Sequence, residues 1–280
     1  MVMIDAHQHY WNPARGDYDW MPLDNETLAR PYGPGDLAPA LARHDIAGTV
    51  LVQAAATVEE TAYMLGIADA TDHVKAVVGW VDFERPEHRA VLERLARHPK
   101  FRGVRPMIQD IPDDDWMLRA DVQWGFEAVR DLDLAFDALG FPRHLANFLT
   151  ILTHYPDMRV VVDHCMKPQI RDHSDANFRV WAEGMRRIAQ ETQAYCKLSA
   201  LVTEADPGWT VEDLRPYAEH VLDVFGPGRV MWGSDWPVCR LRAEYDDWRA
   251  AAEALTAGLD DADRARVFGG TAVTFYRLDV

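Results

Sequence analysis

The stretch Met3-Ile4-Asp5-Ala6-His7-Gln8-His9 opens the chain and predicts the first strand of the fold. Side chains on a strand alternate between its two faces. We therefore expect His7 and His9 to point the same way, as two ligands of one metal or two arms of one polar site. Eleven histidines in 280 residues also produce close pairs by chance. The pair indicates a functional site only when it is considered together with the ionisable residues elsewhere in the chain.

The pattern of this first strand recurs along the chain, where short apolar runs alternate with polar turns and amphipathic segments. Thr57 before Glu59 and Glu60 is typical of a helix start, because it pairs a capping hydroxyl with acid in the first turn. Strands that alternate with helices predict a parallel sheet covered on both faces. The expected strands are residues 3–6, 48–53, 76–83, 102–108, 134–140, 159–164, 195–201 and 230–233.

Eight such units favour one (β/α)8 barrel of the α/β class, formed by residues 1–280 as a single domain. The active site of this fold lies at the carboxyl ends of the strands. An open doubly wound sheet is the alternative, but no Gly-x-Gly-x-x-Gly follows the first strand. Residues 11–39 are too long for a simple connection, and we expect them to form a loop over the barrel mouth.

Composition narrows the class of protein further. Forty-five acidic residues against twenty-nine basic ones give a formal charge of −16, which argues against nucleic acid or an anionic membrane as partner. Residues Cys165, Cys196 and Cys239 form no disulfide framework, and their odd number argues against an oxidising compartment. No apolar run approaches the roughly 20 residues of a membrane span, and no signal-type segment precedes the first strand. The sequence therefore predicts a cytoplasmic protein.

Polar residues stand at nearly every expected strand end. Asp235 lies in Gly233-Ser234-Asp235-Trp236-Pro237, where glycine and proline permit a sharp turn that lifts the carboxylate into the mouth; alternatively, Asp235 caps the next helix. His164 is either a site residue or a hydrogen-bonded core residue. Arg105 is either an oxyanion partner or holds strand ends together by an ion pair with Asp82 or Asp110. The full set is His7, His9, Gln53, Asp82, Arg105, Asp137, His164, Lys197 and Asp235.

Five motifs, in order along nearly the whole chain, resemble the amidohydrolase superfamily and its sugar-lactonase branch, which contains L-fuconolactonase and L-rhamnonolactonase. The first is Ile4-Asp5-Ala6-His7-Gln8-His9-Tyr10-Trp11, and the last is Trp232-Gly233-Ser234-Asp235-Trp236-Pro237. The other three are Arg102-Gly103-Val104-Arg105-Pro106, Val162-Asp163-His164-Cys165-Met166-Lys167-Pro168 and Cys196-Lys197-Leu198-Ser199.

The resemblance implies a distorted (β/α)8 barrel that opens a cyclic ester, with a role in carbohydrate catabolism. His7 and His9 match the family's first-strand pair, His164 its sixth-strand histidine and Asp235 its eighth-strand aspartate. The family often adds a lysine or histidine ligand from the fourth or fifth strand, but this chain has Arg105 and Asp137 in those regions. The resemblance therefore implies either one divalent metal, such as zinc, bound by His7, His9, His164 and Asp235, or catalysis without a metal.

Opening a lactone requires an attacking water, stabilisation of the carbonyl oxygen and a proton for the leaving alkoxide. We expect Asp235 to move the proton, while His7, His9 and His164 bind one ion or donate to the carbonyl. Without a metal, Arg105 becomes the main oxyanion partner. The resemblance implies a neutral sugar-acid lactone of the L-fucono, L-rhamnono or L-galactono type as substrate, and a homo-oligomer is compatible with the fold. Candidate substrate contacts are Trp11, Gln53, Lys167 and Trp236, with Trp20 and Tyr32 nearby.

Three alternative functions remain open. A metal-dependent decarboxylase of aromatic acids also occurs in this superfamily and would need a firmly bound divalent ion and a cationic pocket. A hydrolase of another cyclic ester would use the same residues. A sugar-binding protein without activity would have no use for a base beside three histidines.

Overall fold

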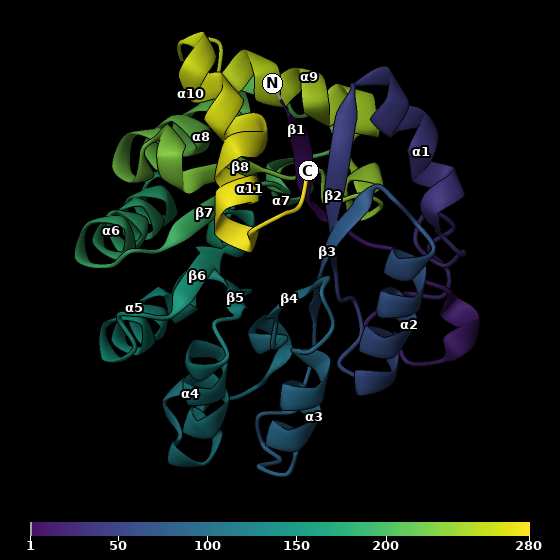
Figure 1. Ribbon diagram of the computed structural model, residues 1–280. Helices are drawn as coiled ribbons and strands as arrows, with labels where there is room; N and C mark the ends of the chain where they lie inside the picture. The colour runs from purple at the N-terminus through teal and green to yellow at the C-terminus, as the bar shows by residue number, and fades with distance from the viewer. Residues whose placement is uncertain (1) are drawn as a thin grey trace.

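The computed structural model describes residues 2–280, and within them eight parallel strands form one sheet in chain order, as the predicted barrel requires (Figure 1). All eight strands expected from the sequence are present. Each pairs in parallel with the next. The strands are β1 (Met3–Gln8), β2 (Ile46–Val52), β3 (Val74–Gly79), β4 (Phe101–Val104), β5 (Ala135–Ala138), β6 (Arg159–Val162), β7 (Tyr195–Leu198) and β8 (Val230–Trp232).

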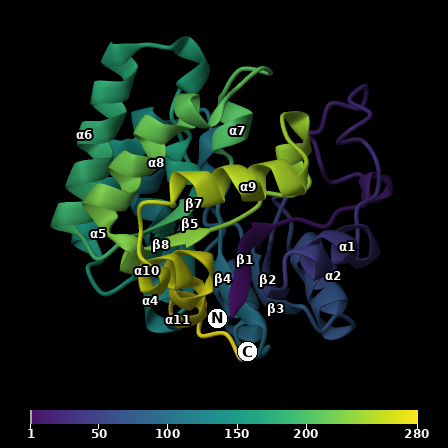
Figure 2. The same ribbon diagram turned by 90° about the horizontal axis from the view of Figure 1, so that it is seen from above.

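Helices follow the strands and surround the sheet, and the two ends of the chain lie together at one end of the barrel (Figures 1 and 2). Within residues 2–280, no helix has the length and apolar character needed to cross a membrane. The helices are α1 (Pro34–Arg43), α2 (Val58–Asp69), α3 (His88–Leu95), α4 (Gln123–Asp131), α5 (Leu145–His154), α6 (Asp175–Glu191), α7 (Leu201–Glu204), α8 (Val211–Phe225), α9 (Tyr245–Leu255), α10 (Asp261–Ala265) and α11 (Thr271–Tyr276).

The barrel is closed by the segment after β8. The Asp235 N–H donates to the carbonyl of His7 at 2.8 Å, and the His9 N–H donates to the carbonyl of Trp236 at 2.7 Å. Gly233 permits this approach, because a Cβ at that position would lie 2.7 Å from the Cβ of His7. The seam therefore places Asp235 directly beside the end of β1.

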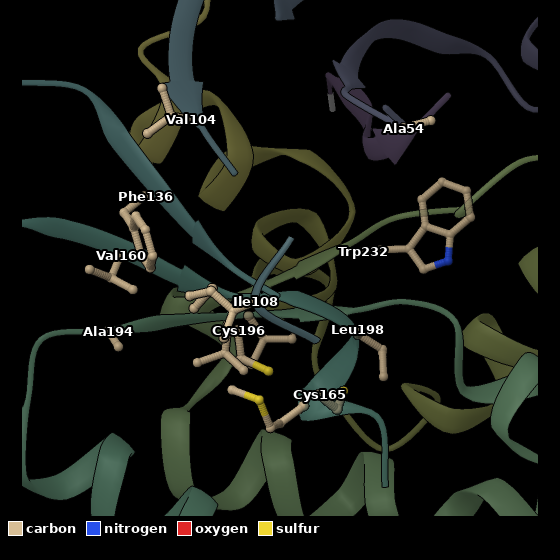
Figure 3. Close-up of a cluster of buried hydrophobic side chains, with 14 of the residues drawn as sticks. Ala54, Val104, Ile108, Phe136, Val160, Cys165, Ala194, Cys196, Leu198 and Trp232 are labelled. Carbon is tan, nitrogen blue, oxygen red and sulfur yellow. The ribbon is translucent and has the colours of Figure 1, made fainter. Parts of the chain in front are cut away.

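Most strand residues are apolar on both faces because both faces are buried. In β6, Val160 and Val162 belong to the larger hydrophobic cluster, whereas Val161 belongs to a second, smaller cluster. The larger cluster extends from strands β4 to β6 to the sulfur atoms of Cys165 and Cys196 (Figure 3). This alternation is what a strand covered on both sides requires, and it explains the near-continuous Val run.

Several boundaries differ from the sequence-based expectation, because β3, β4, β5 and β7 end two to four residues earlier than expected, and two further differences affect the site. The loop expected over residues 11–39 ends at Gly33, because Pro34 starts α1 and the Asp36 carboxylate accepts the Gly33 N–H at 2.9 Å. The strand expected to reach His164 ends at Val162. Residues 164–167 instead have φ values of 55°, 50°, 60° and 47°, a left-handed turn that no strand can contain.

Candidate active site

The three histidines and Asp235 come together at the carboxyl ends of the strands. The Asp235 Oδ1 atom lies 3.3 Å from His9 Nε2, 3.7 Å from His7 Nε2 and 3.9 Å from His164 Nε2. Four side chains from three segments that are far apart in sequence thus share one small volume. The side chain of Asp235 is directed there by its own backbone, which has a left-handed φ of 56°.

His164 reaches this volume through the left-handed turn after β6. Its Nδ1 lies 2.8 Å from the Ser199 hydroxyl, which follows β7 and fixes the ring. Left-handed backbone costs roughly 1–2 kcal/mol per non-glycine residue, so four in succession are retained only where the surrounding structure compensates for them. Since residues three apart in one turn share a side, the turn also brings Lys167 to the mouth.

A layer of buried charges lies beside the histidines, and three of its members, Asp137, Asp163 and Lys197, are fully buried. The Lys197 ammonium contacts Asp137 Oδ2 at 2.5 Å and Asp163 Oδ1 at 3.0 Å. Arg105 Nη1 contacts Asp163 Oδ2 at 3.2 Å and His7 Nε2 at 3.3 Å. Because each carboxylate faces a cation, the charges offset one another's loss of hydration.

This layer corrects one alternative drawn from the sequence, an ion pair of Arg105 with Asp82 or Asp110. The partner of Arg105 is Asp163, because the guanidinium points across the barrel and not along its rim. The Asp82 carboxylate instead accepts the Glu84 N–H at 2.9 Å in a turn.

A cavity of about 300 Å³ opens above the cluster. Two of the candidate substrate contacts, Trp11 and Lys167, are among its lining residues, and so is Trp20 of the long loop. Among residues 2–280 the lining does not include Gln53, whose side-chain amide donates to the Arg105 carbonyl at 2.7 Å. It does not include Trp236, which packs edge-on against Tyr32 at 5.0 Å between ring centroids. His9, Arg105, His164 and Asp235 line the cavity, whereas His7 lies behind them.

Burial and neighbouring charge set the protonation of the site. Burial lowers the pKa of His164 to about 3, and it also lowers the pKa values of His9 and His7. For Asp235, burial acts to raise the pKa, but His164, the hydrogen bond with His9 and the charge of Lys167 together outweigh it, and the pKa falls below its ordinary value. At neutral pH the site therefore holds an ionised carboxylate beside neutral imidazoles, which suits a base.

Three donor atoms have the spacing of a metal site. His7 Nε2, His9 Nε2 and Asp235 Oδ1 lie 3.2, 3.3 and 3.7 Å from one another. Ligand atoms 2.0–2.1 Å from zinc are about 3.3 Å apart in a tetrahedron, so these three fit one ion by distance. A second group, His7, Asp163 and His164, is also close enough. Both oxygens of Asp163 already face Lys197 and Arg105, however, so the geometry favours one ion over two.

Some residues of the site received no role from the sequence. The Asp5 carboxylate accepts the backbone N–H groups of His7 at 3.2 Å and Ser234 at 2.8 Å, and so joins the two sides of the seam. The two-residue period that relates His7 to His9 also includes Asp5 and could have indicated it. Asp163 and Ser199 lie in quoted motifs, but their partners are set by packing across the barrel.

Comparisons with known proteins identify the family of the chain. Residues 4–278 match the family model described as "Amidohydrolase". An L-fucono-1,5-lactonase of Burkholderia ambifaria is 44% identical over 99% of this chain and 96% of its own length. An L-fucono-1,5-lactonase of Burkholderia multivorans is 37% identical over 99% of this chain and 96% of its own length. A crystal structure of an amidohydrolase from Burkholderia multivorans with bound zinc superposes with a TM-score of 0.93 at 36% identity, and covers 100% of both chains.

Proposed function

The chain belongs to the amidohydrolase family as a hydrolase of sugar lactones, and we propose that Asp235 is the acid and base of its reaction. The observation that carries this assignment is the ionised Asp235 carboxylate, which lies in the cavity lining within 3.9 Å of three imidazoles. The relatives that hydrolyse L-fucono-1,5-lactone support a substrate of that type, a six-membered ring with several hydroxyls.

Asp235 acts twice in the reaction. Its carboxylate takes a proton from a water molecule as the water oxygen bonds to the lactone carbonyl carbon. The ring C–O bond of the resulting tetrahedral intermediate then breaks, and Asp235 returns the proton to the leaving ring oxygen. The product is the open aldonic acid. Proton transfer by a positioned group of this kind contributes about 10²–10⁴-fold in rate.

Arg105 supports the same step electrostatically. Its guanidinium lines the cavity, and the side chain is held by Asp163 on one side and by the carbonyl of Gln53 on the other. A fixed positive charge in a water-poor site stabilises negative charge that develops on the carbonyl oxygen. Gln53 is therefore proposed to hold Arg105 in place, while Trp11 and Lys167 contact the sugar.

A divalent ion, zinc in this proposal, would be held by His7, His9 and Asp235, the residues whose spacing fits it. Bound there, it would polarise the lactone carbonyl and promote ionisation of a water molecule. The zinc reported for the Burkholderia multivorans structure supports this assignment. The cytoplasmic location and the role in carbohydrate catabolism stay predictions from the sequence.

A screen of lactones tests the function. Purified protein is mixed with the L-fucono, L-rhamnono and L-galactono lactones in weak buffer with a pH indicator, and proton release is compared with enzyme-free controls. We expect release above the spontaneous rate, fastest with the L-fucono-1,5-lactone. Folded protein that accelerates none of them would refute the proposal.

Repeating the screen with EDTA addresses the metal. If the protein still hydrolyses a lactone after chelation, the side chains catalyse the reaction without a divalent ion. Complete loss, restored by zinc, would assign a required ion to the three-residue site.

A further inference from the structure

Glu60 is a fully buried acid that no step of the proposed reaction uses. It lies in the first turn of α2, and its carboxylate accepts two backbone N–H groups from the segment that follows β2. The Ala54 nitrogen is 3.1 Å from Oε1 and 2.9 Å from Oε2, and the Ala55 nitrogen is 2.7 Å from Oε2. One carboxylate therefore holds two consecutive peptide groups.

The first of these peptide groups orients Arg105. A trans peptide bond is planar, so its N–H and its C=O point in opposite directions. The bond between Gln53 and Ala54 is trans. Because its N–H donates to Glu60, its carbonyl points the other way, where it accepts a hydrogen bond from the Arg105 guanidinium. Glu60 is thus connected through one peptide plane to the proposed oxyanion partner.

The second peptide group, between Ala54 and Ala55, orients Trp20 in the same way. Its N–H donates to Glu60, and its carbonyl accepts the Trp20 indole N–H at 2.6 Å. Trp20 and Ala54 both line the cavity of about 300 Å³ above the catalytic cluster. The same carboxylate is therefore connected to a wall of this cavity as well as to Arg105.

We propose that Glu60 is a positioning residue, which sets Arg105 and Trp20 against the lactone through the two peptide groups after β2. Buried N–H groups that lose their acceptor carry a large cost, so these peptide planes would turn to find another one. A planar group turns as a unit, so its carbonyl would then leave Arg105 or Trp20. The effect on catalysis rests on the proposed function, but the hydrogen-bond arrangement does not.

Two variants remove the carboxylate to different extents. Glu60→Gln keeps one oxygen that can accept both N–H groups, but it loses the charge and turns an amide donor toward the Ala54 N–H. Hydrogen bonds to a charged acceptor are about twice as strong as neutral ones, so the glutamine should hold the peptide groups less firmly. Glu60→Ala removes both acceptors and should have the larger effect.

The indole signals of the ¹H–¹⁵N spectrum test the arrangement without turnover. The chain has ten tryptophans, and the indole signal that is missing in Trp20→Phe belongs to Trp20. A short hydrogen bond shifts the indole proton downfield. We expect this signal to move upfield in Glu60→Gln and further upfield in Glu60→Ala. An unmoved Trp20 signal in folded Glu60→Gln would overturn the proposal, whether or not Glu60→Ala folds.

Kinetics with L-fucono-1,5-lactone test the effect on the reaction. Burial raises the pKa of Glu60 to about 7, so the proteins are compared at pH 8, where the wild-type carboxylate is mostly ionised. We expect kcat/KM to fall about tenfold in Glu60→Gln and about 100-fold in Glu60→Ala, through both a higher KM and a lower kcat. A variant with fewer folded molecules would instead lose kcat at an unchanged KM.

A double-mutant cycle identifies the route through Trp20. Trp20→Phe keeps an aromatic ring but lacks the indole donor, so Glu60→Gln should raise KM no further in that background. The same KM increase in both backgrounds would contradict the connection through the Ala54 carbonyl.

Glu59→Gln is the matched control, because Glu59 is exposed in the same first turn of α2 and its loss removes the same charge from the same helix end. We expect its indole spectrum, KM and kcat to equal those of wild type. If no lactone is hydrolysed but the Trp20 signal moves in Glu60→Gln, the proposed function is wrong and the arrangement stands. If a lactone is hydrolysed but the signal does not move, this inference is wrong and the function stands.

Discussion

At the scale of single residues, buried carboxylates connect the stability of the barrel to pH. Asp5 is fully buried at the seam, and burial raises its pKa to about 6 against the hydrogen bonds from Ser234, His7 and Tyr245. A carboxyl whose pKa rises on folding binds a proton as the protein folds. Its stabilising contribution is present below about pH 3.8 and is lost as the pH rises through about 6.

Asp5→Asn tests this account of the seam. The amide oxygen can accept the two backbone N–H groups that Asp5 now accepts, and the amide does not ionise. A shift of about two pKa units corresponds to about 3 kcal/mol. Relative to wild type, the variant should therefore gain up to about 3 kcal/mol in unfolding free energy between pH 4 and pH 8, measured by urea denaturation.

Exposed Asp19 provides the matched control. The unfolding free energy of Asp19→Asn should differ from that of wild type by the same amount at pH 4 and at pH 8. If the unfolding free energy of Asp5→Asn also differed from that of wild type by the same amount at pH 4 and pH 8, the claim that Asp5 binds a proton on folding would be wrong.

At the scale of elements, the seam between β1 and the segment after β8 depends on Gly233. An added Cβ would lie 2.7 Å from the Cβ of His7 and 3.0 Å from its backbone nitrogen. Gly233→Ala should therefore lower the unfolding free energy by about 1–3 kcal/mol, the usual cost of overpacking. It should also lower kcat, because His7 and Asp235 move apart.

Gly228→Ala is the control, because nothing lies within 4 Å of a Cβ there. We expect its unfolding free energy to stay within about 0.5 kcal/mol of wild type. If Gly233→Ala had the unfolding free energy and kcat of wild type, the close contact between β1 and the segment after β8 would not be required for stability or activity.

The long loop is the second element with a testable role. The Trp20 indole N–H donates to the Ala54 carbonyl at 2.6 Å, and the ring packs edge-on against Trp11 at 5.6 Å between centroids. An aromatic pair and a hydrogen bond each contribute about 1 kcal/mol. Trp20→Ala should therefore raise KM about tenfold with a smaller change in kcat, measured with the lactone that the screen identifies.

Leu23 lies on the same loop and is 84% exposed, so Leu23→Ala should leave both constants unchanged. If the two variants behave alike, the loop does not form a wall of the cavity.

At the scale of the whole molecule, the alternation of apolar runs and amphipathic segments is sufficient to predict an eight-stranded barrel, because strands buried on both faces are mostly apolar. It also predicted which chain segments end at the mouth, since parallel strands share one carboxyl edge. His7, His9, His164 and Asp235 could be proposed for this reason.

Pairings across the barrel could not be predicted in the same way. Whether Arg105 meets Asp82, Asp110 or Asp163 depends on the direction of a long side chain. Whether Lys197 faces solvent or Asp137 depends on packing from other strands. The left-handed turn at residues 164–167 has no glycine to announce it, so the sequence predicted a strand through His164.

The central claim is that Asp235 moves the proton during lactone opening, and the kcat of Asp235→Asn tests it most directly. Asp82→Asn is the matched control, a carboxylate after β3 that lies outside the cavity lining within residues 2–280. Both variants should unfold at the wild-type temperature. We predict that kcat falls about 10²–10⁴-fold in Asp235→Asn and stays near wild type in Asp82→Asn. A folded Asp235→Asn protein with kcat within about tenfold of wild type would contradict the account.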